Sequence, residues 1–245
     1  MERQKKAVLS DRLFSLVEML RGDQEPAQAE STYRCVADVG CDHGFVSIRI
    51  CQENIAQSAI ASDVKEGPLL RAKEHVEEYG MQERISTVLS NGMQHLHAGE
   101  ADGAIIAGMG GFLMRDILKE AGERQALPPV LILQPQNGWR QLRESLRQMA
   151  FSIIKEKMLT EEGKTYVVIR AQQGNVPREE VADPIADAFG PYLLKMKDQQ
   201  LHAYLLREQR KYDEIYQTIK AAGKEDSTVE EKRIELSEAL KRMSM

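Results

Sequence analysis

The sequence has little cysteine, no long apolar run and no excess of basic charge. Its three cysteines, Cys35, Cys41 and Cys51, lie close together at spacings that match no zinc signature, and their odd number argues against a disulfide framework. No run of about eighteen apolar residues could cross a membrane, and the charged residues 1–6 lack the apolar core of a signal peptide. We therefore predict a cytoplasmic protein with reduced thiols, no metal and no membrane partner.

The charge balance limits the partners further. The 245 residues include 33 Lys and Arg against 38 Asp and Glu, which gives a formal net charge of −5 and a pI near 5.7. Such a chain does not bind nucleic acid through its overall charge, so an RNA partner would need a local basic patch. The length is sufficient for one sizeable α/β core with an appendage, or for two small domains.

Residues 35–44, CVADVGCDHG, form the motif around which the chain is organised. An apolar run leads through Asp38 to Gly40, and after Gly44 an apolar pattern resumes at helical spacing. The pattern predicts a strand, a tight turn and a helix whose first amides face a polar ligand. The spacing G-x-x-x-G fits the dinucleotide fingerprint G-x-G-x-x-G poorly. An acid before the first glycine suits S-adenosylmethionine, which carries an ammonium group and no phosphate, although such a turn is often only a tight connection.

Alternating apolar and helical patterns predict a parallel sheet. The expected strands cover residues 35–39, 58–62, 85–89, 102–107 and 130–134. The last of these is almost wholly apolar, which is typical of a parallel strand covered on both faces. Residues 151–158 and 164–171 predict an antiparallel hairpin at the sheet edge, with a turn over residues 159–163. The expected fold class is α/β, a Rossmann-like doubly wound sheet of seven strands.

Polar residues and glycines follow the strands, at the edge where a doubly wound sheet binds its ligand. Asp63 follows the second strand where such folds bind a ribose, although it could equally cap the next helix. Asn91 follows the third strand and could meet an adenine edge. The glycines of residues 108–111 leave backbone groups open to a flat substrate. The alternative, that these residues form a flexible linker, is disfavoured because an apolar helix follows at once. Residues 134–137, after the fifth strand, are expected to complete the ligand-binding crevice at this edge of the sheet.

Helical patterns flank the predicted sheet. Residues 9–20 predict an amphipathic lid helix capped by Ser10 or Asp11. Residues 172–184 are polar and suggest a boundary between domains 1–180 and 181–245. The second domain is expected to be a helical hairpin whose last helix begins with a capping box at Ser227. Its polar face contains Lys195, Lys197, Arg207, Arg210, Lys211 and Lys220. A solvated surface is the simplest interpretation of this face.

Taken together, these motifs resemble those of the bacterial tRNA (adenine-22-N1)-methyltransferases, class I S-adenosylmethionine enzymes with a C-terminal coiled-coil-like helical domain. The resemblance covers nearly the whole chain. It is carried by residues 9–13, 38–43, 65–69, 106–111, 131–135, 161–166 and 190–193. Ala-Gly-Met-Gly-Gly at residues 107–111 is the most specific segment, because amino-group methyltransferases usually have an Asn/Asp-Pro-Pro-aromatic motif there. Asn91 departs from the usual Asp of the family, and Asp63 from the frequent Glu.

The resemblance implies methyl transfer from S-adenosylmethionine to N1 of an adenine in tRNA, with position 22 expected. The implied cofactor-binding residues are Asp38, Gly40, Cys41, Gly44, Asp63, Val64, Asn91, Gly92, Ala107, Gly108 and Met109. The implied catalytic candidates are Asp42, His43, Gln134 and Asn137. Among these, Asp38 is expected to orient the methionine ammonium group and Asp42 to favour the cationic product. His43 is either a substrate contact or a hydrogen-bonded helix cap.

RNA phosphates are expected to meet Arg3, Lys5, Lys6 and Arg12 together with the basic residues of the helical hairpin. Two other functions fit the same residues. One is methyl transfer to a different RNA or to a small molecule, and the other is a non-catalytic S-adenosylmethionine-binding protein whose helical hairpin recruits a partner. The sequence does not distinguish a monomer from a larger assembly.

Overall fold

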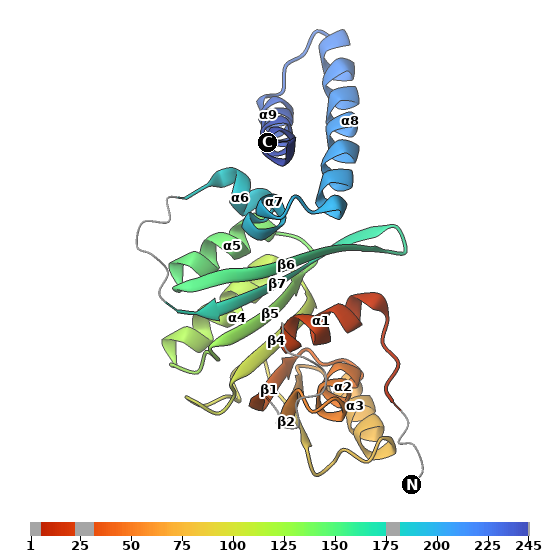
Figure 1. The fold of residues 1–245 in the computed structure, drawn as a ribbon, viewed down its shortest axis with the longest axis vertical. Coiled ribbons are helices and arrows are strands. Elements are labelled where there is room, and N and C mark those ends of the chain that lie inside the picture. The colour runs from red at the N-terminus through yellow and green to blue at the C-terminus, as the bar shows by residue number, and fades with distance from the viewer. Residues whose placement is uncertain (1–5, 23–31, 175–181, 245) are drawn as a thin grey trace.

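The computed structural model describes residues 6–22, 32–174 and 182–244. The strands are β1 (Tyr33–Val39), β2 (Ala56–Asp63), β3 (Ile85–Leu89), β4 (Gly103–Met109), β5 (Val130–Pro135), β6 (Phe151–Glu161) and β7 (Lys164–Gln173). They form one seven-stranded sheet in the order β3-β2-β1-β4-β5-β7-β6 (Figure 1). The first five strands are parallel, and β7 pairs antiparallel with β5 and β6. The predicted doubly wound sheet with an edge hairpin is confirmed.

Helices cover both faces of the sheet (Figure 1). One face carries α1 (Asp11–Arg21), α2 (Phe45–Gln52) and α3 (Glu66–Glu78), and the other carries α4 (Gly111–Glu123) and α5 (Trp139–Gln148). Side chains of β5 alternate between the two cores, since Leu131 belongs to the cluster with α4 and Ile132 to the cluster with α1. Every residue of β5 is buried, as predicted for a strand covered on both faces.

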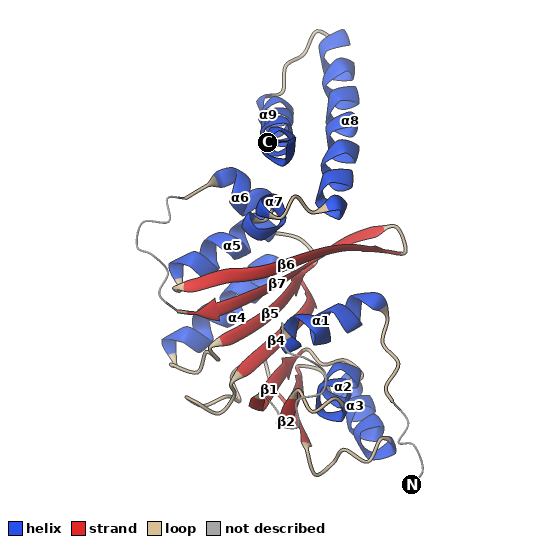
Figure 2. Ribbon diagram, in the orientation of Figure 1, coloured by secondary structure: helices blue, strands red, loops and turns tan. Residues whose placement is uncertain are grey.

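The edge hairpin is longer than the sequence suggested. β6 continues to Glu161 and β7 begins at Lys164, so the turn contains only Glu162 and Gly163. Their φ angles of 50° and 75° suit a two-residue hairpin turn, whose backbone twist matches that of the strands. Figure 2 shows the arm formed by β6 and β7 extending past the neighbouring strands next to α1. Glu161 Oε2 accepts a hydrogen bond from the Arg12 backbone N–H at 2.9 Å, so this arm holds the start of α1.

The C-terminal part of the chain is helical from Pro184. It consists of α6 (Pro184–Phe189), α7 (Pro191–Lys195), α8 (Gln199–Ala221) and α9 (Ser227–Ser244). The long helices α8 and α9 follow one another and contact each other, which confirms the predicted C-terminal helices; in Figure 1 α8 is seen lengthwise and α9 nearly along its axis. The predicted domain boundary at residue 180 lies outside the described residues. In the described parts of the chain, no helix has both the length and the apolar character needed to cross a membrane.

Aspartates begin both long helices of this region. Lys197, with a φ of 50°, separates α7 from α8, and Asp198 caps α8 because its side chain accepts a hydrogen bond from Leu201 N at 2.9 Å. The predicted capping box at Ser227 is wrong. Asp226 caps α9 instead, since its Oδ1 accepts hydrogen bonds from the backbone N–H groups of Thr228 and Val229 at 2.9 and 3.3 Å.

At the N-terminal helix the choice between two caps is resolved. Ser10 has extended backbone angles, and its side chain accepts a hydrogen bond from Leu13 N at 3.4 Å. Asp11 is instead the first residue of α1, where its negative charge is favourable near the helix N-terminus. This cap fixes the point at which α1 turns toward the ends of the strands.

Candidate active site

A cavity of about 350 Å³ opens at the carboxyl ends of β1, β2 and β4. It is walled by the end of β1 and its turn to α2, the first turn of α2, the ends of β2 and β4, and the first two turns of α1. The lining residues are Arg12, Leu13, Leu16, Asp38, Gly40, Cys41, Asp42, His43, Phe45, Val46, Asp63, Ala107, Gly108 and Met109. The structure thus brings residues from four separate segments to one place, at the edge where doubly wound sheets bind ligands.

Asp38 places a buried carboxylate on the wall of this cavity. Only 5% of the residue is exposed, and its Oδ2 accepts a hydrogen bond from Ser47 Oγ at 2.7 Å. Burial raises the pKa of Asp38 from the ordinary 3.8 to about 6, because a charge is poorly solvated there. Within the described chain Asp38 has no cationic partner. A buried carboxylate in this state favours a cationic ligand group.

The turn after β1 is fixed by backbone hydrogen bonds. The N–H groups of Gly40 and Cys41 both donate to Ser62 O, at 2.8 and 2.9 Å. Gly40 has a φ of 75°, and a Cβ at this position would overlap the end of the Met109 side chain. The glycine therefore permits the turn and lets the end of β4 approach it. Cys41 is buried on the cavity wall as a free thiol, and its burial raises the pKa of that thiol.

Asp42 and His43 form a polar pair at the mouth of the cavity. Asp42 Oδ2 lies 2.8 Å from His43 Nδ1, and the two side chains are 66% and 41% exposed. Asp42 has a φ of 50°, which is uncommon for a residue other than glycine. His43 does not cap α2, whose N-cap is Gly44. The helix-cap interpretation of His43 is therefore wrong, and its ring is available at the cavity.

Asp63 joins the ends of β2 and β1. Its Oδ2 accepts a hydrogen bond from Asp42 N at 3.4 Å, and its Oδ1 accepts one from Lys65 N at 2.9 Å. Lys65 is the N-cap residue of α3, so Asp63 is not the helix cap that the sequence allowed. Asp63 lines the cavity, and its carboxylate oxygens have capacity for further donors.

The glycines after β4 permit a close approach between two loops. Gly111 begins α4, and its N–H donates to Asn137 O at 3.0 Å. A Cβ on Gly111 would lie 2.6 Å from both Asn137 O and Gly138 O, which backbone atoms cannot easily relieve. Gln136 N also donates to Met109 O at 2.8 Å. The segment Ala-Gly-Met-Gly-Gly therefore packs the end of β4 against the turn after β5.

The model of one protein family, described as tRNA (adenine(22)-N(1))-methyltransferase and named TrmK, matches residues 36–244. The chain belongs to the TrmK family. A tRNA (adenine(22)-N(1))-methyltransferase of Bacillus subtilis (strain 168) is 32% identical over 214 residues, which are 86% of this chain and 87% of that protein. The family predicted from the motifs is confirmed.

Solved structures agree with this family. The crystal structure of the B. subtilis m1A22 tRNA methyltransferase TrmK has a TM-score of 0.79 and 29% identity, covering 98% of both chains. A Streptococcus pneumoniae protein, described as a candidate tRNA (m1A22) methyltransferase and crystallised with S-adenosyl-L-methionine, has a TM-score of 0.80 and 28% identity. That match covers 95% of this chain and 100% of the other. Both comparisons extend through the C-terminal helices.

Two of the residues predicted for catalysis in this TrmK-family chain lie away from the cavity wall. Gln134 is completely buried, and its Oε1 accepts a hydrogen bond from Arg12 Nη1 at 2.9 Å. Arg12 reaches the cavity in its place. Asn137 lines a second, neighbouring cavity. Gln134 could contact a substrate base only if Arg12 moved, whereas the Arg12 side chain already lines the cavity.

Four of the predicted cofactor-binding residues are outside the cavity lining. They are Gly44, Val64, Asn91 and Gly92. Gly44 has a φ of 71° and supports the turn into α2. Val64 is 61% exposed beside Asp63, and the hydrogen bond from Ser90 N to Asp63 O at 2.9 Å brings Asn91 to the same edge. The contact of these four residues with a cofactor remains a prediction.

The sequence predicted a lid helix and a ligand-facing start of α2, but it did not identify which of their side chains line the cavity. Leu13 and Leu16 belong to an apolar stripe, which indicates a lid helix but does not show what the helix covers. Arg12 was predicted to contact phosphate, yet it lines the cavity and lies 5.4 Å from the Tyr166 ring centroid. Phe45 and Val46 come from the first turn of α2 and follow directly from the glycine motif.

Proposed function

We propose that this chain transfers the methyl group of S-adenosylmethionine to N1 of an adenine in tRNA, the adenine at position 22 being the expected target. The observation that carries the proposal is a buried carboxylate, Asp38, facing a cavity at the sheet edge in a chain of the TrmK family. The S. pneumoniae relative crystallised with S-adenosyl-L-methionine supports the cofactor. The B. subtilis relative supports the substrate.

The residues of the cavity fit the groups of this cofactor. Asp38 would hold the methionine ammonium group, because it is a buried anion that lacks a cation in the described chain. Asp63 would accept hydrogen bonds from the ribose hydroxyls. Asn91 and Gly92 would lie near the adenine, and the backbone of residues 107–109 would border the reacting end. When bound, the cofactor supplies an electrophilic methyl group.

The protein's part in the reaction is mainly alignment and electrostatics. Adenine N1 has an in-plane lone pair and is unprotonated at neutral pH, so no strong base is needed to activate it. The cavity must accept a base taken out of its stack and hold N1 in line with the reacting group. Because methylation makes the adenine ring cationic, a carboxylate at the cavity mouth favours the product-like charge. Asp42 is in that place, and His43 holds its side chain at 2.8 Å.

Asp42→Asn tests this electrostatic role. The variant keeps the shape of the side chain but loses its charge, so we expect kcat to fall about 100-fold while the cofactor Kd changes by less than about twofold. Turnover is measured as labelled methyl incorporated into unmodified tRNA, and the Kd by calorimetry. Asp116→Asn on α4 is the matched control, since Asp116 is 61% exposed and outside the cavity. Undiminished turnover in Asp42→Asn would remove this residue from the mechanism.

The raised pKa of Asp38 predicts a pH dependence of cofactor affinity. Below a pKa of about 6 the carboxyl becomes protonated and no longer attracts an ammonium group. The Kd should therefore be nearly constant between about pH 7 and pH 6.5 and should rise about tenfold per pH unit once the pH is well below 6. Calorimetric titrations from pH 5 to 7, with circular dichroism to verify folding, measure this. A constant Kd down to pH 5 contradicts the assignment.

The overall activity is tested with transcripts. Purified protein is incubated with unmodified tRNA and labelled S-adenosylmethionine, and the methylated base is mapped. We expect N1-methyladenine at position 22, and no product when a guanine replaces that adenine. Product elsewhere would favour another RNA substrate. Cofactor binding without transfer to any tRNA or small molecule would favour a binding protein that recruits a partner.

We also propose the organisation in which this activity operates. Residues 1–180 would form the methyltransferase domain and residues 181–245 the helical domain, which packs against α5 and β6. A monomer would be sufficient, because one chain provides the whole cavity wall. A cytoplasmic location suits both tRNA and three buried free cysteines. Alkylation of N1 by a sulfonium compound requires no metal.

A further inference from the structure

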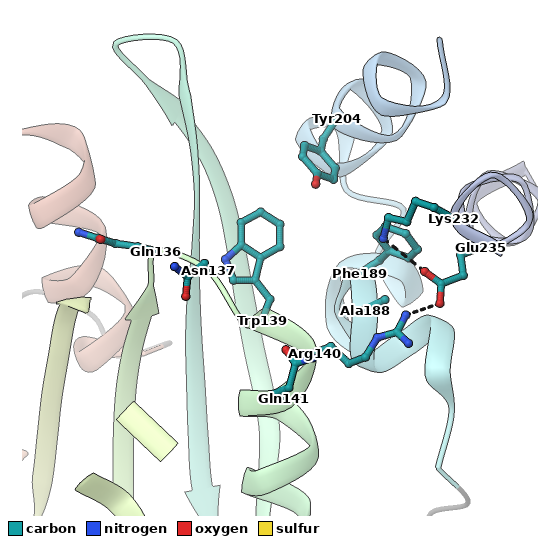
Figure 3. A pocket seen from close by; sticks show the side chains of 11 residues that line it. Gln136, Asn137, Trp139, Arg140, Gln141, Ala188, Phe189, Tyr204, Lys232 and Glu235 are labelled. Carbon is teal, nitrogen blue, oxygen red and sulfur yellow. Dashed lines mark hydrogen bonds and ion pairs between the residues drawn. The ribbon is translucent and has the colours of Figure 1, made fainter. Parts of the chain in front are cut away.

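A second cavity, of about 450 Å³, lies between the start of α5 and the C-terminal helices. Figure 3 shows Trp139 on one side of it and Phe189, Lys232 and Glu235 on the other, with Tyr204 at one end. These side chains come from α5, α6, α8 and α9, so the cavity exists only because the helical domain packs on the sheet domain.

The cavity presents aromatic surfaces that are held in place. The Trp139 and Tyr204 ring centroids are 5.8 Å apart, and Trp139 Nε1 donates a hydrogen bond to Pro135 O at 3.2 Å. Phe189 is buried, and Lys232 Nζ lies 4.9 Å from its ring centroid. Proteins bind unstacked RNA bases on such aromatic faces, which are frequently accompanied by cations.

The charged and polar groups suit a nucleotide as well. Glu235 pairs with both Arg140 and Lys232, which leaves a net positive charge among the three. The side chains of Gln136, Asn137 and Gln141 line the same space. Their amide groups can donate to and accept from the edge of a base, while the excess cation favours a phosphate.

This cavity shares a wall with the candidate active site. Met109 lines the first cavity and Gln136 the second, and Gln136 N donates to Met109 O at 2.8 Å. We propose that the second cavity binds the base of a nucleotide adjacent to the target adenine, unstacked from the tRNA. The inference rests on the proposed function, since it takes tRNA as the substrate.

The chain provides its own reporter for this site, because Trp139 is its single tryptophan. Adding unmodified tRNA should quench the Trp139 emission, since a base would stack close to the indole. A transcript with an abasic site at the neighbour that occupies the cavity should bind without that quenching, whereas an abasic site at the target position should preserve it. If quenching is lost only with the target base, the cavity holds the target itself and the proposal is wrong.

Substitutions test how much the side chains of the second cavity contribute to tRNA binding. Tyr204→Leu and Lys232→Gln should each raise the KM for tRNA about tenfold, with little change in the cofactor Kd or in kcat. The matched controls are Tyr216→Leu, farther along α8, and Lys241→Gln, farther along α9, which remove the same groups outside the cavity. Melting temperatures of all four variants show whether each one folds.

The outcomes separate this proposal from the proposed function. If the wild-type protein methylates tRNA but its emission does not respond and both variants keep the wild-type KM, the second cavity is not a nucleotide site and the methyltransferase stands. If emission responds to tRNA without any methyl transfer, the nucleotide site stands and the proposed function fails. Equal effects of the cavity variants and their controls would indicate general electrostatic or stability changes and would overturn the proposal.

Discussion

Asp38→Asn is expected to lose S-adenosylmethionine binding and, in the same variant, to stabilise the cofactor-free protein above pH 6. The loss of binding follows from the position of the carboxylate, which is 5% exposed on the cavity wall. Removing one member of a buried charge pair weakens binding by about 100-fold or more. Calorimetry with the wild-type protein and the variant at pH 7.5 measures the effect.

The gain in stability follows from the sign of the pKa shift. The folded-state pKa of Asp38, about 6, lies above the ordinary 3.8, so between these pH values the folded protein holds a proton that the unfolded chain has released. The free energy of unfolding therefore falls as the pH rises through this range, by up to about 3 kcal/mol at about 1.4 kcal/mol per pKa unit. Asparagine carries no charge and can still accept the hydrogen bond from Ser47. Urea denaturation of cofactor-free protein should show a larger stabilisation at pH 8 than at pH 5.

Asp63→Asn is the control for both effects. Asp63 lines the same cavity but is only partly buried, so its substitution should weaken cofactor binding without the gain in stability expected for Asp38→Asn. If Asp38→Asn bound the cofactor as well as the wild-type protein, the assignment of the ammonium site would be wrong. A variant less stable than wild type at pH 8 would show instead that the ionised carboxylate is well accommodated in the folded protein.

Much of the fold could be predicted because its signals are local. The apolar run before Gly40, the wholly apolar β5 and the polar residues after each strand follow from sequence spacing alone. Parallel strands then bring their carboxyl ends to one edge, so Asp38, Asp63 and Gly108 could be placed together before any coordinates. The start of α9 was predicted incorrectly. Asp226 and Ser227 are adjacent and both are suitable N-cap residues, so the sequence alone does not show which of them caps the helix.

The missed features depend on contacts between distant residues. The Arg12 backbone is held by Glu161, 149 positions later, and its side chain contacts Gln134, 122 positions later. The local pattern predicts a lid helix, but it does not show that Arg12 would line the cavity with Gln134 behind it. The second cavity has the same origin, since Trp139 and Tyr204 meet only when the helical domain packs on α5. The spacing of apolar residues predicts which face of a helix is buried but not its partner.

The attachment of the helical domain depends on a buried ion pair. Arg143 Nε lies 2.8 Å from Glu156 Oε1, and neither side chain is exposed. Arg143 Nη1 donates to Asp187 O at 2.8 Å, and Glu156 Oε2 accepts from Tyr192 N at 3.0 Å. The pair therefore joins α5 and β6 to the backbone of α6 and α7. Because each charge is compensated only by this network, removing one of them leaves the other buried and uncompensated.

Glu156→Gln is expected to lower the free energy of unfolding by about 3 kcal/mol, since it leaves the Arg143 guanidinium buried without an anion. The double variant Arg143→Met with Glu156→Leu should recover much of that loss, because it removes both charges and keeps an apolar contact. Glu18→Gln is the control for a solvent-exposed pair, as Glu18 pairs with Lys157 at 2.7 Å, and it should cost less than about 1 kcal/mol. Urea denaturation measures all three variants.

The same substitution separates the two cavities. The walls of the first cavity come from α1, α2 and the ends of β1, β2 and β4, whereas Phe189, Tyr204 and Lys232 in the second cavity are held by the helices that Glu156 anchors. Glu156→Gln should therefore raise the KM for tRNA more than the Kd for the cofactor, when both are measured at a temperature where the variant is folded. An equal loss of both would mean that the helical domain and the cofactor cavity unfold together, and a stability within about 1 kcal/mol of wild type would show that the ion pair is not the anchor.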